Sequence, residues 1–186
     1  MPWRRIRDAC SSGAVEYRGA TADDIGPIAS LHADSWRRNY RGSFSDAFLD
    51  GDVFADRLAE WTERLTTPHR DHHTVVAVDG DAVLGFVHTI FGHDPTWGAL
   101  VDNLHVAHGL KRSGVGTGLM ARSATAVLAR RPVTGLYLWV LDANTAAQAF
   151  YAARSGTCEG SEWSVAPGGG SILGLRYVWP DPTVLV

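Results

Sequence analysis

The chain has 186 residues, of which 45% are hydrophobic and 20% are charged, and its formal net charge is −3. This length and composition are typical of one globular domain with a substantial core. A net negative charge argues against nucleic-acid binding, which normally uses a basic surface.

Two cysteines, Cys10 and Cys158, are too few for a disulfide framework. The sequence has no run of about 18 apolar residues that would span a membrane. Its first residues lack the apolar segment of a secretory signal. We therefore expect a cytoplasmic protein with no membrane and no nucleic acid among its partners.

Residues 1–14 lack hydrophobic periodicity, and we interpret them as an N-terminal tail before a single domain at 15–186. Thr21 followed three residues later by Asp24 resembles a capping box, which starts a helix. The elements expected in this part are a strand at 15–18, a helix that begins at about 22 to 24 and reaches 36, and a helical stretch at 45–65 interrupted near Gly51.

An Asp79-Gly80 pair between two β-branched runs is a strong signal for a β-hairpin. Later a glycine-rich turn opens an amphipathic helix, and the turn at 167–170 separates the last two strands. The elements expected here are strands at 74–78, 83–91 and 99–106, a helix from 114, a strand at 136–141, a helix at 144–154 stopped by Gly156, and strands at 157–165 and 172–179.

Crossovers through a helix require parallel neighbouring strands, whereas hairpins give antiparallel ones. The order of elements therefore predicts an α/β fold of the α+β kind, in which about seven strands form a mixed sheet with helices on both faces.

The most informative segment is the glycine-rich turn Gly114-Val115-Gly116-Thr117-Gly118, which opens a helix. Glycines let the backbone approach a ligand, and the first turn of a helix offers unpaired N–H groups with a partial positive charge. With Lys111 and Arg112 just before it, this turn predicts a phosphate or pyrophosphate site. A tight connection that binds nothing is the alternative.

Other phosphate motifs fit less well. No Gly-Lys pair occurs, which argues against a Walker loop. A dinucleotide fingerprint needs a third glycine, and it needs to follow its strand directly. Asp142, after the next strand, is still able to imitate the acid of such a site, so a nicotinamide-dependent enzyme stays an alternative.

The segment Leu104-His105-Val106 with Lys111-Arg112-Ser113-Gly114-Val115-Gly116-Thr117 resembles the acyl-CoA motif of GNAT N-acetyltransferases. Asn144 and Phe150-Tyr151 resemble the helix that follows in that family, and the resemblance covers about residues 15 to 179. It implies an acyltransferase with acetyl-CoA as co-substrate. It also implies a mostly antiparallel sheet with a central parallel pair. No metal is expected, because His69, His72 and His73 lie in or beside a polar loop, where histidines more often face solvent than bind a metal.

By this resemblance the turn amides bind the pyrophosphate of CoA, with the Thr117 hydroxyl as a further donor. The edge of the preceding strand pairs with the pantetheine amides. Lys111 replaces the Arg or Gln that is usual in the family, and Asn144 suits an N-cap as well as a contact with pantetheine. The positions assigned to acetyl-CoA are Leu104, His105, Val106, Lys111, Arg112, Ser113, Gly114, Val115, Gly116, Thr117 and Asn144.

Tyr151 matches the tyrosine that protonates the leaving thiolate in many members, and a phenol is a suitable acid for a thiolate. Leu100 stands where histone-type relatives have a glutamate base. We expect Asp102, on the same strand face as Leu100, to be the base, with His105 on the opposite face. A water relay is the alternative. The backbone N–H near Val106 would stabilise the oxyanion.

Trp36, Tyr40 and Trp163 are expected to contact the acceptor, although aromatic residues at such spacing more often pack in the core. The acceptor is expected to be an amine of a small molecule or peptide, or else a protein N-terminus or lysine. Family members often form dimers, so a homodimer is compatible with the resemblance. A CoA-binding sensor without turnover is the alternative from another class.

Overall fold

The computed structural model describes residues 14–67, 69–110, 112–130 and 135–186. Within this part of the chain, strands join into one sheet in the order β1-β2-β3-β4-β5-β7-β6. The strands are β1 (Glu16–Gly19), β2 (His72–Asp79), β3 (Ala82–Asp94), β4 (Gly98–Val106), β5 (Leu136–Leu141), β6 (Thr157–Val165) and β7 (Ser171–Trp179).

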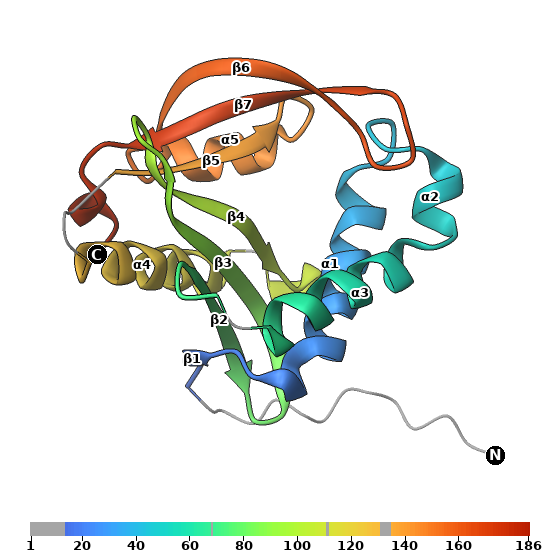
Figure 1. The fold of residues 1–186 in the computed structure, drawn as a ribbon, viewed down its shortest axis with the longest axis horizontal. Coiled ribbons are helices and arrows are strands. Elements are labelled where there is room, and N and C mark those ends of the chain that lie inside the picture. The colour runs from blue at the N-terminus through green and yellow to red at the C-terminus, as the bar shows by residue number, and fades with distance from the viewer. Residues whose placement is uncertain (1–13, 68, 111, 131–134) are drawn as a thin grey trace.

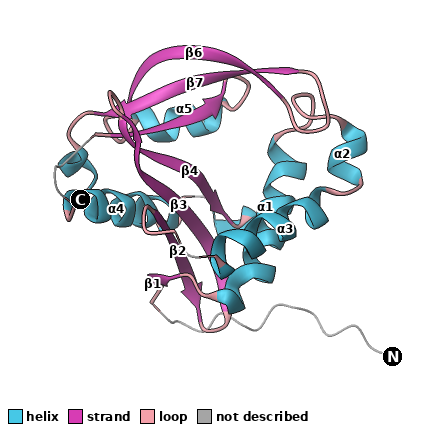
Figure 2. Cartoon of the chain, viewed as in Figure 1, coloured by secondary structure: helices cyan, strands magenta, loops and turns pink. Residues whose placement is uncertain are grey.

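Helices cover both faces of the sheet, as Figures 1 and 2 show. They are α1 (Ile25–Asn39), α2 (Asp46–Asp50), α3 (Val53–Thr66), α4 (Val115–Leu128) and α5 (Thr145–Ala152). Helices α4 and α5 pack on one face with Val87, Val101 and Leu138. Helices α1 and α3 pack on the other, where Trp61 and Phe86 are fully buried. The predicted α/β fold is therefore confirmed.

The pair β4 and β5 is parallel, and the other neighbouring strands are antiparallel. The parallel pair is short, because its register contains only Ala99↔Leu136 and Leu100↔Tyr137. Beyond these positions the two strands diverge, and Figure 1 shows β4 and β5 pointing in different directions. The predicted central parallel pair is thus present, and it opens toward the carboxyl ends of its strands.

The predicted capping box is present, on a 3-10 turn at Ala22–Asp24 that leads directly into α1. The backbone N–H of Thr21 donates to Asp24 Oδ2 over 2.7 Å, and Asp24 is only 3% exposed. Arg18 donates to both carboxylate oxygens over 2.8 and 2.9 Å. These hydrogen bonds, led by those from Arg18, lower the pKa of Asp24. They also attach β1 to the start of α1.

The end of α5 differs from the prediction. Gly156 does not take the left-handed conformation that stops many helices; Ser155 does, with φ 63°. The N–H groups of Ser155 and Gly156 donate to Ala152 and Tyr151 carbonyls, which is a Schellman arrangement. Gly156 is required for packing instead, because a Cβ there would lie 2.6 Å from the Trp179 ring.

Candidate active site

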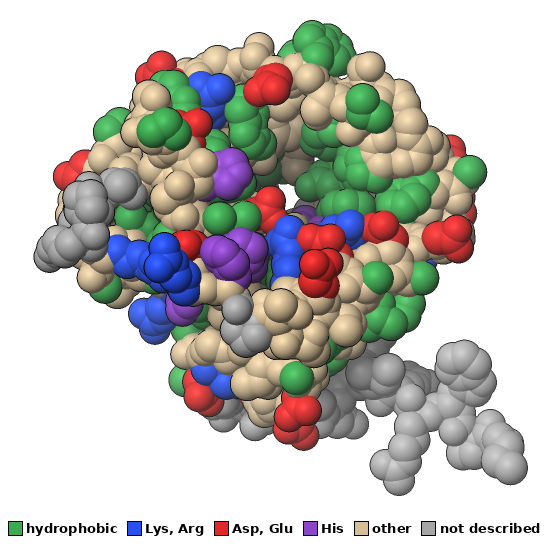
Figure 3. Space-filling view, viewed as in Figure 1, with side chains coloured by type: hydrophobic (Ala, Val, Ile, Leu, Met, Phe, Trp, Pro, Cys, Tyr) green, Lys and Arg blue, Asp and Glu red, His purple; other side chains and the backbone are tan. Residues whose placement is uncertain are grey.

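A cleft of about 1100 Å³ lies where β4 and β5 diverge. It reaches both faces of the sheet, because Ser35 and Trp36 of α1 line one end and Gly116 of α4 and Phe150 of α5 line the other. Figure 3 shows the molecule hollowed near its centre. A ligand on the α4 side therefore meets a ligand on the α1 side through the split in the sheet.

The N-terminus of α4 opens into this cleft. Gly114 is the N-cap, with φ 90°, a conformation in which a side chain is strained. The first bond within the helix runs from the Gly118 N–H to the Gly114 carbonyl over 2.9 Å. The N–H groups of Val115, Gly116 and Thr117 donate to no residue that the structure describes. These three amides are available to an anionic ligand.

Gly116 and Gly118 each lack room for a side chain, but different neighbours restrict the two positions. A Cβ at Gly116 would lie 3.3 Å from the Phe150 ring, at the wall of the cleft. A Cβ at Gly118 would lie 2.1 Å from the Tyr17 hydroxyl, on the side of the helix that packs against β1. Gly116 therefore belongs to the ligand side of α4, whereas Gly118 is a packing position.

Arg154, which sequence reasoning missed, is held at the same helix end. Its Nε donates to Thr117 Oγ1 over 3.0 Å, and its Nη2 donates to the same oxygen. Its guanidinium stacks 3.7 Å from the Phe150 ring centre, and burial lowers its pKa. With its oxygen accepting from Arg154, Thr117 keeps its own hydroxyl proton for a ligand. Arg154 is near in space but 37 residues from Thr117 in sequence.

Asn144 caps α5 and also lines the cleft. Its Oδ1 accepts from the Ala147 N–H over 3.2 Å, so the N-cap interpretation is confirmed. Its contact with pantetheine stays a prediction.

Tyr151, on α5, lines the cleft, and its exposed fraction is 8%. Its ring packs among Phe150, Tyr177 and Trp179. Burial, and then the nearby Tyr40 phenol, raise the pKa of Tyr151 well above that of an ordinary tyrosine. Its hydroxyl forms no hydrogen bond with a described residue, and it is therefore a protonated and unengaged acid at neutral pH.

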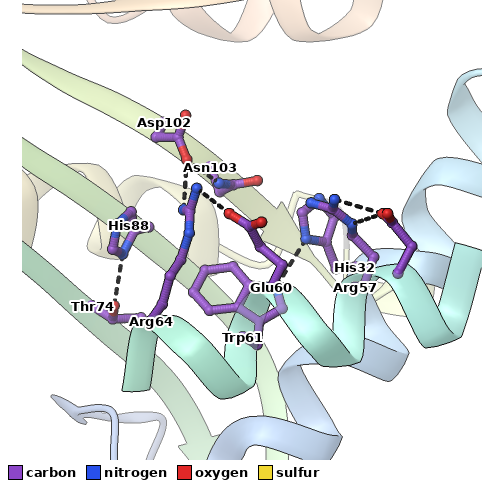
Figure 4. Close-up of polar contacts among 10 residues, drawn as sticks. His32, Arg57, Glu60, Trp61, Arg64, Thr74, His88, Asp102 and Asn103 are labelled. Atoms are coloured by element: carbon purple, nitrogen blue, oxygen red, sulfur yellow. Dashed lines mark hydrogen bonds and ion pairs between the residues drawn. The ribbon is translucent and has the colours of Figure 1, made fainter. Parts of the chain in front are cut away.

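Asp102 occupies a β-bulge in β4. His88 pairs with Asn103 and Thr89 pairs with Val101, so Asp102 has no partner in β3. Its Oδ2 accepts from Arg64 Nη1 over 2.6 Å and from Asn103 Nδ2 over 2.6 Å (Figure 4). Its Oδ1 has no hydrogen bond to a described residue and is left for a ligand.

The bulge also overturns the expected position of His105. Strict alternation placed Asp102 and His105 on opposite faces, but the extra residue shifts the phase by one. His105 pairs with Phe86 and its ring lies 4.4 Å from that of His32 in α1, on the face where Asp102 meets Arg64 of α3. Both side chains line the cleft from this face.

His105 is held by a hydrogen bond to α1, on one side of the cleft. Its Nδ1 and the Ser35 Oγ form a hydrogen bond of 2.8 Å. Desolvation by burial, followed by the charge of Arg57, lowers its pKa to about 4. The imidazole is thus neutral at physiological pH.

The end of the cleft on the α1 side is aromatic. Trp36, Tyr40 and Phe44 line it from α1 and the following turn, and Trp139 lines it from β5. Burial raises the pKa of Tyr40 to about 12. Glu162 of β6 adds a carboxylate to the rim, and it has no ion pair with a described residue.

Trp163 lies outside the cleft lining. Its neighbours Glu162 and Ser164 line the cleft, and alternation along β6 turns Trp163 to the opposite face, where it is 68% exposed. The structure thus gives no geometric support to its predicted contact with substrate. Alternation from Glu162 could have shown which of these neighbours faces the site.

The remaining predicted positions divide into three groups. Leu104, Val106, Arg112, Gly114, Gly116 and Thr117 line the cleft, and so do Asn144 and His105. Val115 and Ser113 do not, because Val115 is buried at 2% exposure and the Ser113 hydroxyl donates to the Leu110 carbonyl over 2.7 Å. The prediction for Lys111 falls outside the described residues.

Two further observations concern metals and membranes. Among residues 14–67, 69–110, 112–130 and 135–186, no group of three or more His, Cys, Asp or Glu side chains is placed to hold a metal ion. Within the same described ranges, none of the helices combines the length and apolar character needed to cross a bilayer.

The split between β4 and β5 and the cleft that crosses it are able to receive one ligand on the α4 face of the sheet and a second on the α1 face. The model of the acetyltransferase (GNAT) family matches residues 32–156, which is more than half of the chain. The chain belongs to this family, and it is an acyltransferase.

Known proteins agree with this assignment. A probable N-acetyltransferase of Mycobacterium tuberculosis is 24% identical over 155 residues, covering 82% of this chain and 86% of that protein. The structure of PaiA N-acetyltransferase of Thermoplasma acidophilum in complex with coenzyme A has a TM-score of 0.68 at 16% identity, covering 90% of this chain and 100% of that one. Arabidopsis thaliana NAA60 in complex with acetyl-CoA has a TM-score of 0.66 at 17% identity, covering 89% and 98%.

Proposed function

We propose that this protein transfers the acetyl group of acetyl-CoA to an amine of a small molecule or peptide by direct attack. The observation that carries the proposal is the cleft itself, which joins the N-terminus of α4, at Gly114, Gly116 and Thr117, on one face of the sheet to a group of aromatic side chains on the other. Acetylation of a protein N-terminus or lysine is the finer alternative. The structure of NAA60 in complex with a bisubstrate analogue belongs to the same fold, with a TM-score of 0.67 at 16% identity over 89% of this chain and 97% of that one.

The residues present fit an acetyl-CoA molecule. Its pyrophosphate would accept from the amides at 115–117 and from the Thr117 hydroxyl, beside the charges of Arg112 and Arg154. Its pantetheine arm would follow β4 from Val106 toward the bulge, where β5 no longer pairs. The thioester would then lie beside Tyr151.

The chemistry needs no covalent enzyme intermediate. The neutral amine nitrogen forms a bond to the thioester carbonyl carbon, and the backbone N–H near Val106 stabilises the oxyanion. The C–S bond then breaks, and Tyr151 donates its proton to the departing thiolate. The attached nitrogen, which carries a positive charge after the attack, gives one N–H proton to the Tyr151 phenolate, which leaves a neutral amide and restores the phenol. Most of the acceleration comes from holding the two substrates in contact.

The acceptor end suits an ammonium group on an apolar body. The free Oδ1 of Asp102 and the carboxylate of Glu162 would attract the charge, and Trp36 and Trp139 would receive the apolar part. We thereby give Asp102 a binding role, because Arg64 and Asn103 already hold its other oxygen. The homodimer and the cytoplasmic location stay predictions.

Thermal unfolding with saturating acetyl-CoA tests the co-substrate. A ligand at about 100 times its Kd adds roughly 2.7 kcal/mol to the free energy of unfolding. We expect an upward shift with acetyl-CoA and none with NADH, and a smaller shift in Thr117→Ala than in the matched control Thr125→Ala on the same helix. No shift with acetyl-CoA would overturn the proposal.

An amine screen for released thiol tests turnover. At least one primary amine should release CoA thiol at a rate that depends on the concentration of both substrates. A shift with acetyl-CoA but no thiol release across a wide panel would instead support a sensor without turnover.

A further inference from the structure

We infer that His105 accepts the proton of the incoming amine and that Ser35 conducts it to a small pocket on the outer side of α1. This inference rests on the proposed transfer to an amine and goes beyond it, because it names the proton acceptor and the exit route. It replaces the earlier expectation that Asp102 is the base.

His105 faces the part of the cleft where we propose that the amine binds. The bulge at Asp102 turns His105 to the face where the acceptor enters, and His105 lines the cleft together with Tyr40 and Trp36. Tyr151, the proposed acid, lines the same cleft. An acid and a proton acceptor are thus available to one reacting centre, as an amide-forming transfer requires.

Ser35 forms hydrogen bonds through which a proton would leave His105. Asn39 Nδ2 donates to Ser35 Oγ over 3.2 Å, and His105 Nδ1 lies 2.8 Å from the same oxygen. A hydroxyl oxygen accepts two hydrogen bonds and donates one. If Asn39 and His105 both donate, the Ser35 proton is left to point outward, and Nε2 of His105 carries the free lone pair.

A small pocket outside Ser35 would receive the proton. A second, small pocket of about 10 Å³ lies on the outer side of Ser35, and Ser35, Asn39 and Val106 line both pockets. About this volume is enough for the centre of one water molecule. Asp34 and His108 line the outer pocket, so a proton delivered there meets polar groups and solvent. Ser35 is therefore the hydroxyl that separates the reaction chamber from an exit.

Asp102 is less suited to this task. Its Oδ2 accepts from both Arg64 and Asn103, and Arg64 also pairs with Glu60 over 2.6 Å (Figure 4). With Oδ2 already accepting two hydrogen bonds, only Oδ1 of Asp102 is left for a ligand, and an ammonium group is a suitable partner for it.

The protons balance along the route. The ammonium N–H bond breaks, its electron pair stays on the amine nitrogen, and the proton goes to Nε2 of His105. The Nδ1 proton goes to Ser35 Oγ, and the Ser35 hydroxyl proton goes to a water molecule in the outer pocket. The imidazole remains neutral at the end, and exchange with solvent restores the first tautomer.

The groups around His105 favour a ring that passes the proton on over a ring that stays protonated. The groups that face His105 are His32 from α1, Arg57 from α3 and Asp102 from its own strand. Burial and the charge of Arg57 disfavour an imidazolium, while Asp102 favours it weakly. A ring that does not retain the proton must transfer it to a neighbouring group, and the Ser35 hydroxyl is such a group.

The test compares His105→Gln, Asp102→Asn and Ser35→Ala with the control Ser30→Ala, an exposed serine of the same helix. The acceptor is the best primary amine from the thiol-release screen. For H105Q we expect kcat/KM to fall by roughly 10²–10⁴-fold at neutral pH. This deficit should become about tenfold smaller for each pH unit by which the pH is raised toward the pKa of the amine. The fraction of amine that is already deprotonated grows with pH, and this fraction needs no base. S35A should show a smaller deficit with the same pH dependence.

Several outcomes would overturn the inference. One is an H105Q variant that matches S30A, and another is a pH-dependent deficit in D102N instead. Each variant is first checked for the thermal shift with acetyl-CoA, so that a misfolded protein is not counted. If H105Q does not fold, ¹⁵N NMR of the wild-type and S35A imidazoles replaces it, and unchanged Nδ1 resonances in S35A would reject the relay. A screen that finds no acceptor contradicts the proposed function, whereas the NMR result still reports on the relay.

Discussion

Arg64 in α3 donates from Nη1 to Asp102 Oδ2 over 2.6 Å and thereby ties a helix to the bulged residue of β4 (Figure 4). The same guanidinium pairs with Glu60 over 2.6 Å. Two carboxylates share one cation, so the three side chains together carry a net negative charge. Asp102 Oδ1, which has no hydrogen bond to a described residue, is the oxygen that we propose binds the ammonium group.

Asp102→Asn should therefore weaken the binding of the amine more than it slows the chemical step. We expect KM for the amine to rise about tenfold, which corresponds to about 1.4 kcal/mol, with kcat little changed. The shape of the pH–rate profile should stay that of the wild type. Steady-state kinetics with Glu60→Gln as the control checks this, and a large fall in kcat with unchanged KM would restore Asp102 as the base.

Tyr151→Phe should lower kcat by roughly 10²–10⁴-fold, because the thiolate then leaves without a proton donor. The raised pKa of Tyr151 keeps the phenol protonated across neutral pH. Its ionisation should therefore give no falling limb of the pH–rate profile near neutrality. Tyr177→Phe is the matched control, since Tyr177 packs against Tyr151 but does not line the cleft. An acetyl-CoA thermal shift equal to that of the wild type is expected in both variants, and equal kcat values would refute the acid role.

The order of elements, the mixed sheet and the glycine turn could be predicted, because each depends on residues close together in sequence. Periodicity, the Asp79-Gly80 hairpin signal and the turn at 114–118 are local patterns. The structure places strands and helices where these patterns indicated.

The parts that could not be predicted depend on contacts between distant segments. An extra residue at Asp102 changes the face of His105, and alternation alone cannot reveal a bulge that the partner strand defines. The hydrogen bond between Ser35 and His105 spans 70 residues, and the one between Arg154 and Thr117 spans 37. Neither pair has a sequence signature.

Ser155→Gly should stabilise the fold. Ser155 has φ 63°, a left-handed conformation that costs a residue with a Cβ about 1–2 kcal/mol. Glycine removes that strain but loses more entropy on folding, so we expect a net gain of about 1 kcal/mol in the free energy of unfolding. Chemical denaturation measures it. Gly156→Ala should act in the opposite direction because of the Trp179 contact. A Ser155→Gly variant that is less stable than the wild type would show that the serine is not strained.

His88 should make the protein sensitive to acid. It is fully buried, its Nδ1 lies 2.7 Å from the Thr74 hydroxyl, and burial lowers its pKa to about 3. The unfolded chain binds this proton near the ordinary histidine pKa of about 6.5, whereas the folded protein does not. The contribution of neutral His88 to stability is therefore complete above about pH 6.5 and is lost as the pH falls toward 3, by up to about 1.4 kcal/mol per pH unit.

His88→Gln removes this titration, although it also changes the packing against Trp61 and His72. The informative quantity is thus the slope of the unfolding free energy against pH between 6.5 and 4, and not its absolute value. We expect the slope of H88Q to be shallower than that of the wild type by nearly one proton, because the unfolded chain then takes up one proton fewer. Denaturation curves at several pH values measure it. An identical slope would mean that the acid sensitivity arises from other histidines, such as His32 and His105, whose pKa values desolvation also lowers.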